Sequence, residues 1–158
     1  MLIVAPDDPC APGPRALLQD SRAMMLDLFP AEDCYGLTPE ALTAPHIAFF
    51  TAREGGAVLG TGALAVMEGY GEVKAMFTAP NARGRGVGAA LLRQIEDEAR
   101  ARALPCLRLE TGKGLDDAIR LYERDGFERR GIFGDYQPNE TSVFMEKPLD
   151  DSGAAGAI

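Results

Sequence analysis

The feature that most constrains the fold is the segment ARGRGVGAALL at residues 82–92, where three glycines and two arginines run directly into an apolar helical pattern. Glycine lets the backbone adopt unusual dihedral angles and approach a ligand closely. The first turn of a helix has free N–H groups, which favour an anion and are helped by nearby arginine side chains. The segment therefore predicts a phosphate-binding loop that joins a strand to a helix.

Two common phosphate-binding motifs fit this loop less well. A P-loop requires GxxxxGK[ST], and the nearest segment, TGKG at residues 111–114, lacks the upstream glycine and the hydroxyl residue. Residues 84–89 match the dinucleotide pattern GxGxxG/A, and Glu110 follows at the end of a later strand. However, Pro80 interrupts the strand before the first glycine, and the chain is too short for both halves of that fold. A dinucleotide-binding protein remains one alternative.

Apolar periodicity and turn residues divide the rest of the chain into strands and helices. Strands are predicted over residues 2–4, 46–53, 57–67, 71–78, 106–110, 127–133 and 141–149, and helices over 15–28, 38–42, 88–103 and 115–126. Hairpins come first and a strand–helix–strand unit follows. This order predicts an α/β fold with a mixed, mostly antiparallel central sheet of six to seven strands and helices on both faces. We expect a single domain over residues 1–149 and a disordered tail over 150–158.

Two segments together resemble one family. Residues 83–88, RGRGVG, fit the loop [Q/R]-x-x-G-x-[G/A] of the GCN5-related N-acetyltransferases, and AIRLYERDGFE at 118–128 resembles that family's A-x-x-L-Y-x-x-x-G-F segment. One helix and one strand separate them, as in the family, and the resemblance covers about residues 46–149. FGDY followed by SVFMEKPL is similar to a bacterial small-molecule branch. The resemblance implies the acyl-CoA N-acyltransferase fold and acetyl-CoA-dependent transfer to a primary amine of a small molecule or amino acid, by direct attack in a ternary complex.

The resemblance also assigns the residues that bind acetyl-CoA. The loop holds the pyrophosphate, strand residues near 76–78 pair with the pantetheine arm, and the strands at 72–78 and 106–110 splay apart to admit it. The backbone N–H of Met76 or a neighbour is expected to face the thioester oxygen. The assigned residues are Met76, Phe77, Thr78, Arg83, Gly84, Arg85, Gly86, Val87, Gly88, Ala89, Ala118 and Tyr122. One departure is Leu115, which stands where the family often has an asparagine.

Two side chains are candidates for proton transfer. On the strand 72–78, alternation places Val73, Ala75 and Phe77 on one face, and Glu72 with Lys74 on the other. Glu72 is a candidate base for the amine, and a structural ion pair with Lys74 is the alternative. Tyr122 is the candidate acid, because by resemblance its hydroxyl points at the thioester sulfur and a phenol is protonated at neutral pH. The alternative is a tyrosine of the helix core.

The acceptor site is expected among acidic and aromatic residues near the ends of strands. Glu110, Tyr35 and Tyr136 are the candidates, although residues of these types are also common in caps and loops. If none of the proposed groups acts in transfer, the chain is an acyl-CoA-binding module without turnover. The resemblance also implies a homodimer.

Charge and composition exclude several other classes. The net charge of −8 is unsuited to a nucleic-acid surface, although six arginines gather between residues 83 and 108, where they are expected to serve an anionic ligand. We find no apolar run long enough to span a membrane and no signal peptide, which predicts a cytoplasmic protein without membrane partners. The single histidine, His46, and three dispersed cysteines make a metal site unexpected.

Overall fold

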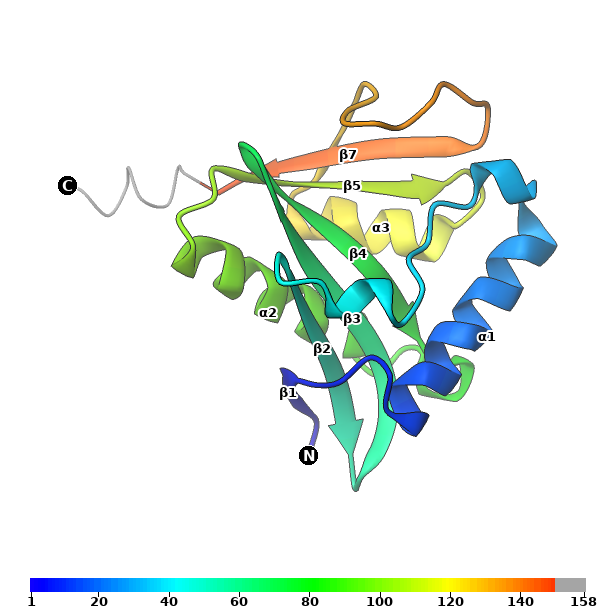
Figure 1. Cartoon of the computed structure of the whole chain (residues 1–158), viewed down its shortest axis with the longest axis vertical. Coiled ribbons are helices and arrows are strands. Elements are labelled where there is room, and N and C mark those ends of the chain that lie inside the picture. Colours follow the sequence, from blue (N-terminus) through cyan, green and yellow to red (C-terminus); the bar gives the residue numbers. More distant parts are fainter. Residues whose placement is uncertain (150–158) are drawn as a thin grey trace.

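A computed structural model describes residues 1–149 and has one seven-stranded sheet at its centre (Figure 1). The strands are β1 (Ile3–Pro6), β2 (Ile47–Glu54), β3 (Ala57–Met67), β4 (Tyr70–Thr78), β5 (Cys106–Gly112), β6 (Glu128–Arg130) and β7 (Ser142–Pro148). Their order across the sheet is β1-β2-β3-β4-β5-β7-β6, and only the β4–β5 pair is parallel. The predicted mixed, mostly antiparallel sheet is confirmed. The predicted tail lies outside the described residues.

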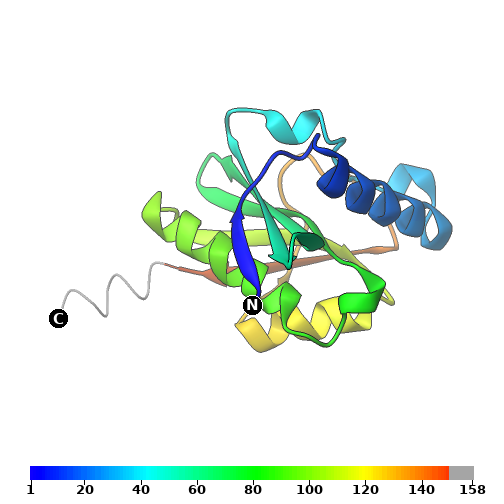
Figure 2. The same cartoon turned by 90° about the horizontal axis from the view of Figure 1, so that it is seen from below.

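Helices cover both faces of the sheet, as predicted (Figure 2). They are α1 (Pro12–Leu28), α2 (Val87–Ala101) and α3 (Asp116–Asp125), with 3-10 turns η1 (Ala31–Asp33), η2 (Ala41–Thr43) and η3 (Pro80–Ala82). The cluster of Leu18, Leu42, Phe49 and Ala63 joins α1 and η2 to one face, and α2 and α3 pack on the other. Between residues 1 and 149, no helix is both long and apolar enough to cross a bilayer.

Two predicted elements are shorter than the sequence pattern indicated. The helix expected over 38–42 is only the turn η2, to which Thr38 contributes its Oγ1 as an acceptor 3.1 Å from the backbone N of Ala41. The strand expected over 127–133 pairs with β7 only at Glu128–Arg130. Phe133 turns inward instead and packs edge-to-face on Tyr70, so its apolar character reflects tertiary packing rather than strand pairing.

Glycines on β3 let α2 lie close to the sheet. A Cβ added to Gly60 would stand 2.6 Å from Val87 Cγ1 and 3.0 Å from the carbonyl oxygen of Phe77. A Cβ on Gly62 would stand 3.1 Å from Ile95. Because these two positions have no side chain, α2 can lie this close to β3, and the loop that leads into the helix lies correspondingly close.

Strand β4 does not alternate evenly, which corrects the prediction that Val73, Ala75 and Phe77 share one face. Ala75 has φ +55°, and the β3–β4 register shifts by one residue between Thr61 and Ala63. This is a β-bulge on β4, which sets Ala75 against the α1 side of the sheet while Val73 faces the α2 side. Alternation in sequence could not reveal it, because the inserted residue has no signal of its own.

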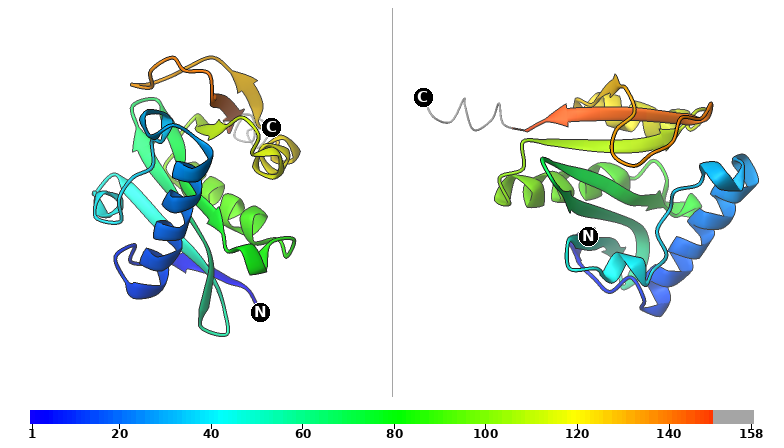
Figure 3. Two further views of the ribbon diagram at one scale, coloured as in Figure 1. Left: turned by 90° about the vertical axis from the view of Figure 1, so that its right-hand side faces the viewer. Right: turned by 45° about the horizontal axis from the view of Figure 1, so that its top comes forward.

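The central strands β4 and β5 separate after Glu72, ahead of the bulge at Ala75, as expected for residues 72–78 and 106–110. β4 and β5 pair only at Gly71 with Leu107 and at Glu72 with Arg108. From this shared end the two strands diverge toward α1 (Figures 1 and 3). The remaining edge of β4 therefore has no strand partner on its β5 side.

Candidate active site

The gap between β4 and β5 opens into a cavity of about 880 Å³. It extends from α1 and the segment 33–39, past β4, to the first turns of α2 and α3. Most of the predicted site residues line it: Tyr35, Met76, Phe77, Thr78, Arg83, Gly84, Gly86, Val87, Gly88, Ala89, Glu110, Ala118, Tyr122 and Tyr136. Glu72 and Arg85 are the two predicted site residues that do not. One end of the cavity is therefore lined by the loop before α2, and the other end, called the polar end below, is lined by Tyr35, Glu110 and Tyr136.

One end of the cavity is suited to a pyrophosphate. Gly86 precedes α2 in the left-handed conformation, with φ +79°, and no side chain caps the helix. The first turn contains no acidic residue, so its N–H groups remain available to an anion. Arg83 lines the same end, and its guanidinium contacts only Met24 Sδ, at 3.9 Å, among residues 1–149. The residues present therefore fit the phosphate groups of a coenzyme A derivative.

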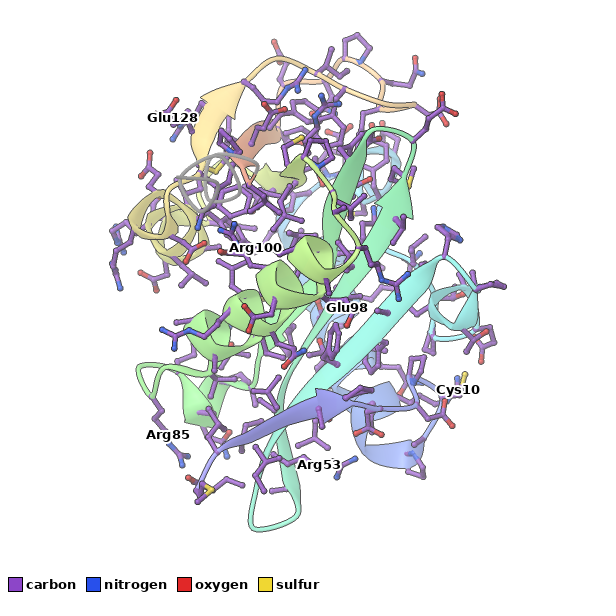
Figure 4. The ribbon with its side chains drawn as sticks, turned by 90° about the vertical axis from the view of Figure 1, so that its left-hand side faces the viewer. Cys10, Arg53, Arg85, Glu98, Arg100 and Glu128 are labelled. Carbon is purple, nitrogen blue, oxygen red and sulfur yellow. The ribbon has the colours of Figure 1, made fainter. Side chains whose placement is uncertain are left out.

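The arginines that gather in sequence do not gather in space, which corrects that expectation. Arg85 pairs with Glu54 at the β2–β3 hairpin and leaves the loop on the side where β1 lies (Figure 4). Arg102 pairs with Glu98 at 2.8 Å, toward the other end of α2. Arg108 pairs with Glu146 at 2.7 Å on β7. A helix of 15 residues is about 22 Å long, so arginines at its two ends cannot serve one ligand.

The bulged part of β4 presents backbone groups to the middle of the cavity. Residues 73–78 all line the cavity, and past Glu72 none of them pairs with β5. The Thr61 hydroxyl donates a hydrogen bond of 2.7 Å to the carbonyl oxygen of Ala75, which holds the bulge in place. Fixed backbone dipoles on such an edge can pair with an extended ligand and stabilise developing negative charge.

Tyr122 reaches the cavity from α3. Its side chain is 6% exposed and packs edge-to-face on Phe127, with ring centroids 5.8 Å apart. No hydrogen-bond partner of its hydroxyl occurs among the described residues. Burial, with a smaller contribution from the charge of Glu110, raises the pKa of Tyr122 above its usual range. The phenol is therefore protonated at neutral pH and available as a proton donor.

Glu110 brings a carboxyl group to the cavity from β5. Burial raises its pKa to about 7, and the charges of Glu72 and Asp33 act in the same direction. A hydrogen bond of 2.7 Å from the Ser142 hydroxyl and the charge of Lys74 act in the opposite direction. A carboxyl group with this pKa changes its protonation near neutral pH, which is the property required of a general base.

Glu72 lies behind the cavity wall in a hydrogen-bonded group. It is 5% exposed, accepts a hydrogen bond from the Tyr136 hydroxyl, and lies 3.3 Å from Lys74 Nζ. Lys74 Nζ is also 3.0 Å from the Tyr136 hydroxyl. Of the two interpretations of Glu72, the structure therefore contains the ion pair with Lys74.

Aromatic rings form the wall at the polar end. Tyr35 and Tyr136 both line the cavity and pack edge-to-face, with centroids 4.8 Å apart. Tyr136 also packs on Phe133 and Phe144. These rings come from two segments that are far apart in sequence, and Tyr35, Tyr136 and Glu110 all line the cavity.

Sequence reasoning missed Ser142, the hydrogen-bond donor to Glu110. It lies on β7 opposite Gly112, next to the pair formed by Thr111 and Val143. A serine at the start of a predicted strand has no distinguishing pattern. Only the β5–β7 register brings it to the carboxyl group.

Comparisons with known proteins agree on one family. The sequence model described as "Acetyltransferase (GNAT) family" matches residues 16–127. The chain is 45% identical over 148 residues to the IAA acetyltransferase of Azospirillum brasilense, covering 92% of this chain and 97% of the relative.

Solved structures share the fold. A protein described as an acyl-CoA N-acyltransferase of Klebsiella pneumoniae superposes with a TM-score of 0.79 at 36% identity, covering 94% of this chain and 98% of that one. A GNAT acetyltransferase of Elizabethkingia anophelis, solved with acetyl-CoA bound, has a TM-score of 0.68 at 18% identity, with 94% and 98% covered. At that lower identity the likeness concerns the fold alone.

Proposed function

The chain belongs to the acetyltransferase (GNAT) family and is an N-acetyltransferase that uses acetyl-CoA; we propose that it acetylates the primary amine of a small molecule or amino acid by direct attack. The observation that carries this proposal is the single cavity lined by the loop before α2, by Tyr122 and by Glu110. Such a cavity admits donor and acceptor together. Direct transfer then needs no covalent intermediate on the protein.

The donor end is assigned to the loop and to β4. The first-turn N–H groups of α2 and the Arg83 guanidinium would hold the pyrophosphate, and the free edge of residues 76–78 would pair with the pantetheine arm. Bound acetyl-CoA supplies an acetyl group activated as a thioester. The N–H groups of the bulge, near Met76, are assigned to stabilise negative charge that develops on its carbonyl oxygen.

Two side chains would handle protons. We assign the base to Glu110 instead of Glu72, because Glu110 lines the cavity and Glu72 does not. Glu110 accepts a proton from the acceptor amine, directly or through water, so that the nitrogen lone pair is free to attack. Tyr122 keeps its proton at neutral pH and would give it to the departing thiolate. Glu72 then serves to hold Lys74 and Tyr136 at the polar end.

A small acceptor is supported by the chemistry of the polar end. Its aromatic walls, Tyr35 and Tyr136, accommodate an apolar body, and Glu110 attracts an amine. The Azospirillum relative is named an IAA acetyltransferase, and this name supports a small acceptor without identifying its reactive group.

Calorimetric titration tests the donor assignment. Acetyl-CoA is expected to bind with micromolar affinity, and Arg83→Ala is expected to weaken that binding about tenfold by removing a phosphate contact. Arg85→Ala is the matched control, since it removes the same charge from the same loop but the Arg85 side chain is turned to Glu54. It should change the affinity less than about twofold. Binding of NADH without binding of acetyl-CoA would overturn the proposal.

A further inference from the structure

A hydrogen-bond group behind Glu110 has no part in the function described so far. The Ser142 hydroxyl lies 2.7 Å from Glu110 Oε2, and Asn139 Nδ2 lies 3.0 Å from the same hydroxyl. Asn139 Oδ1 accepts hydrogen bonds from the backbone N–H groups of Thr141 and Ser142, at 2.8 and 2.7 Å. Three short contacts therefore fix the asparagine side chain in one orientation.

The chemistry of these groups fixes the direction of the hydrogen bond to Glu110. With its oxygen occupied by two N–H groups, the Asn139 amide must present its NH₂ group to Ser142. A serine hydroxyl has one proton, and an NH₂ group cannot accept it. The proton therefore goes to Glu110 Oε2, which leaves Oε1 without a partner among the described residues and open to the cavity.

The same asparagine reaches the segment that covers the polar end. Asn139 Nδ2 lies 3.4 Å from the Tyr35 hydroxyl, and the neighbouring Thr141 hydroxyl donates a hydrogen bond of 2.8 Å to Asp33 Oδ2. The segment before β7 is thus tied both to the carboxyl group on β5 and to the segment that follows α1. These ties set the distance between Tyr35 and Glu110.

We propose that Ser142, oriented by Asn139, is a positioning residue that aims Glu110 Oε1 at the acceptor amine and stabilises the ionised, base-competent carboxylate. This inference rests on the proposed role of Glu110 as the base. Neither side chain touches the substrate in this assignment. Both act through the carboxyl group.

Besides the Ser142 hydroxyl, several charged groups influence the ionisation of Glu110. Lys74 on β4 favours the ionised form, and Glu72 on β4 and Asp33 in η1 disfavour it. The Cys34, Tyr122 and Tyr136 side chains are close enough for Glu110 to influence their own ionisation. Because Ser142 is the hydrogen-bond donor to this carboxyl group, its removal should shift the titration in one direction, toward a higher pKa.

The test is the pH profile of kcat/KM. Wild-type activity is expected to rise with pH through about 7 as Glu110 ionises. Ser142→Ala should move this midpoint up by about one pH unit, which lowers kcat/KM about fivefold at pH 7 and restores most of it above pH 9. Ser142→Thr keeps the hydroxyl and should restore the wild-type midpoint, and Ser142→Cys, a weaker donor, should be intermediate. Ser142→Cys, compared with Ser142→Thr, also serves if the alanine variant does not fold.

Thr141→Val is the matched control. It removes the adjacent hydroxyl, which contacts Asp33 Oδ2 and, at 3.2 Å, Asn139 Oδ1, but not Glu110. The two backbone N–H groups still orient Asn139, so the midpoint should stay in place. An unchanged midpoint in Ser142→Ala, with activity lowered equally at every pH, overturns the inference. If wild-type enzyme has no acid limb near pH 7, or Glu110→Gln keeps that limb, the proposed base fails and the inference fails with it. The two failures are therefore distinguishable.

Discussion

At the scale of single residues, burial raises the pKa of two groups in the site, Tyr122 and Glu110, with opposite consequences for proton transfer. The Tyr122 hydroxyl stays protonated at neutral pH, because its apolar surroundings disfavour the charged phenolate. Glu110 is made a proton acceptor near neutral pH by the same physical cause, moderated by Ser142 and Lys74. One cavity thus contains both the proposed acid and the proposed base.

Replacing Tyr122 by phenylalanine separates its proton from its packing. The ring still packs on Phe127, so the fold and the affinity for acetyl-CoA should change little. Loss of the proton donor should lower kcat by about 10²-fold. Steady-state kinetics and calorimetry on the same preparation measure the two quantities. Equal loss of turnover and of coenzyme affinity would contradict the assignment as the acid.

The two glutamates are distinguished by their pH profiles. Glu110→Gln should lower kcat/KM by about 10²-fold and remove the acid limb near pH 7, because Glu110 is the cavity group to which that limb is assigned. Glu72→Gln should keep that limb but lower the melting temperature, because Lys74 Nζ, with its side chain 15% exposed, loses its ion-pair partner. Retention of the limb in the first variant and its loss in the second would reverse the assignment.

At the scale of elements, the site is positioned by close packing of α2 on β3 and by the bulge in β4. The apolar face of α2 was readable in the sequence from the spacing of Leu91, Leu92 and Ile95, all of which are fully buried. Gly60 and Gly62 beneath it were part of the predicted strand, but the sequence alone gave no reason for glycine at these positions. Their role depends on a helix that follows in the chain and folds back on them.

Gly60→Ala tests this packing. The new Cβ would meet the side chain of Val87 and the backbone of Phe77, which cannot move freely, so we expect a loss of about 2 kcal/mol in the free energy of unfolding. Acetyl-CoA affinity should also fall, since displacement of α2 moves the phosphate-binding loop. Gly131→Ala is the control, because that position is exposed and has no atom within 4 Å of the added Cβ. Chemical denaturation should show a change below about 0.5 kcal/mol for the control, and equal losses in both variants would refute the packing argument.

At the scale of the whole molecule, a buried charged group ties α2, α3 and β7 together. Lys147 Nζ lies 2.9 Å from Glu96 Oε1 and 3.1 Å from Asp125 Oδ2. Glu96 Oε2 is buried without a hydrogen-bond partner among residues 1–149. Burial, and then the nearby Asp125, raises the pKa of Glu96 to about 7. A protonated Glu96 carries no charge, so burial of Oε2 without a partner costs less free energy than it would for a carboxylate.

The sign of the pH dependence of stability follows from this shift. The folded protein holds the Glu96 proton up to about pH 7, whereas the unfolded chain releases it near 4.5. The contribution of the protonated carboxyl group is therefore complete below pH 4.5 and is lost as the pH rises through 7. Glu96→Gln, which is neutral at every pH, should raise the melting temperature over wild type by about 3–6 °C at pH 8 and by much less at pH 5.

Thermal melts at the two pH values measure this difference. Glu98→Gln provides the control on the same helix, because Glu98 forms a more exposed ion pair with Arg102 at 2.8 Å (Figure 4). It should shift the melting temperature by less than about 1 °C at both pH values. A gain for Glu96→Gln that is the same at pH 5 and pH 8 would contradict the protonated state.

The sequence by itself determined the order of strands and helices, the glycine- and arginine-containing loop before α2 and the place of Tyr122 on α3, because each depends on spacing within a short stretch of chain. Only the tertiary structure decided the bulge at Ala75, the burial of Glu72 and the position of Glu110 on the cavity wall. These depend on partners distant in sequence: Ser142 is 32 residues from Glu110, and Tyr136 is 64 residues from Glu72. Burial and hydrogen-bond geometry arise when such segments pack together, and no local pattern encodes them.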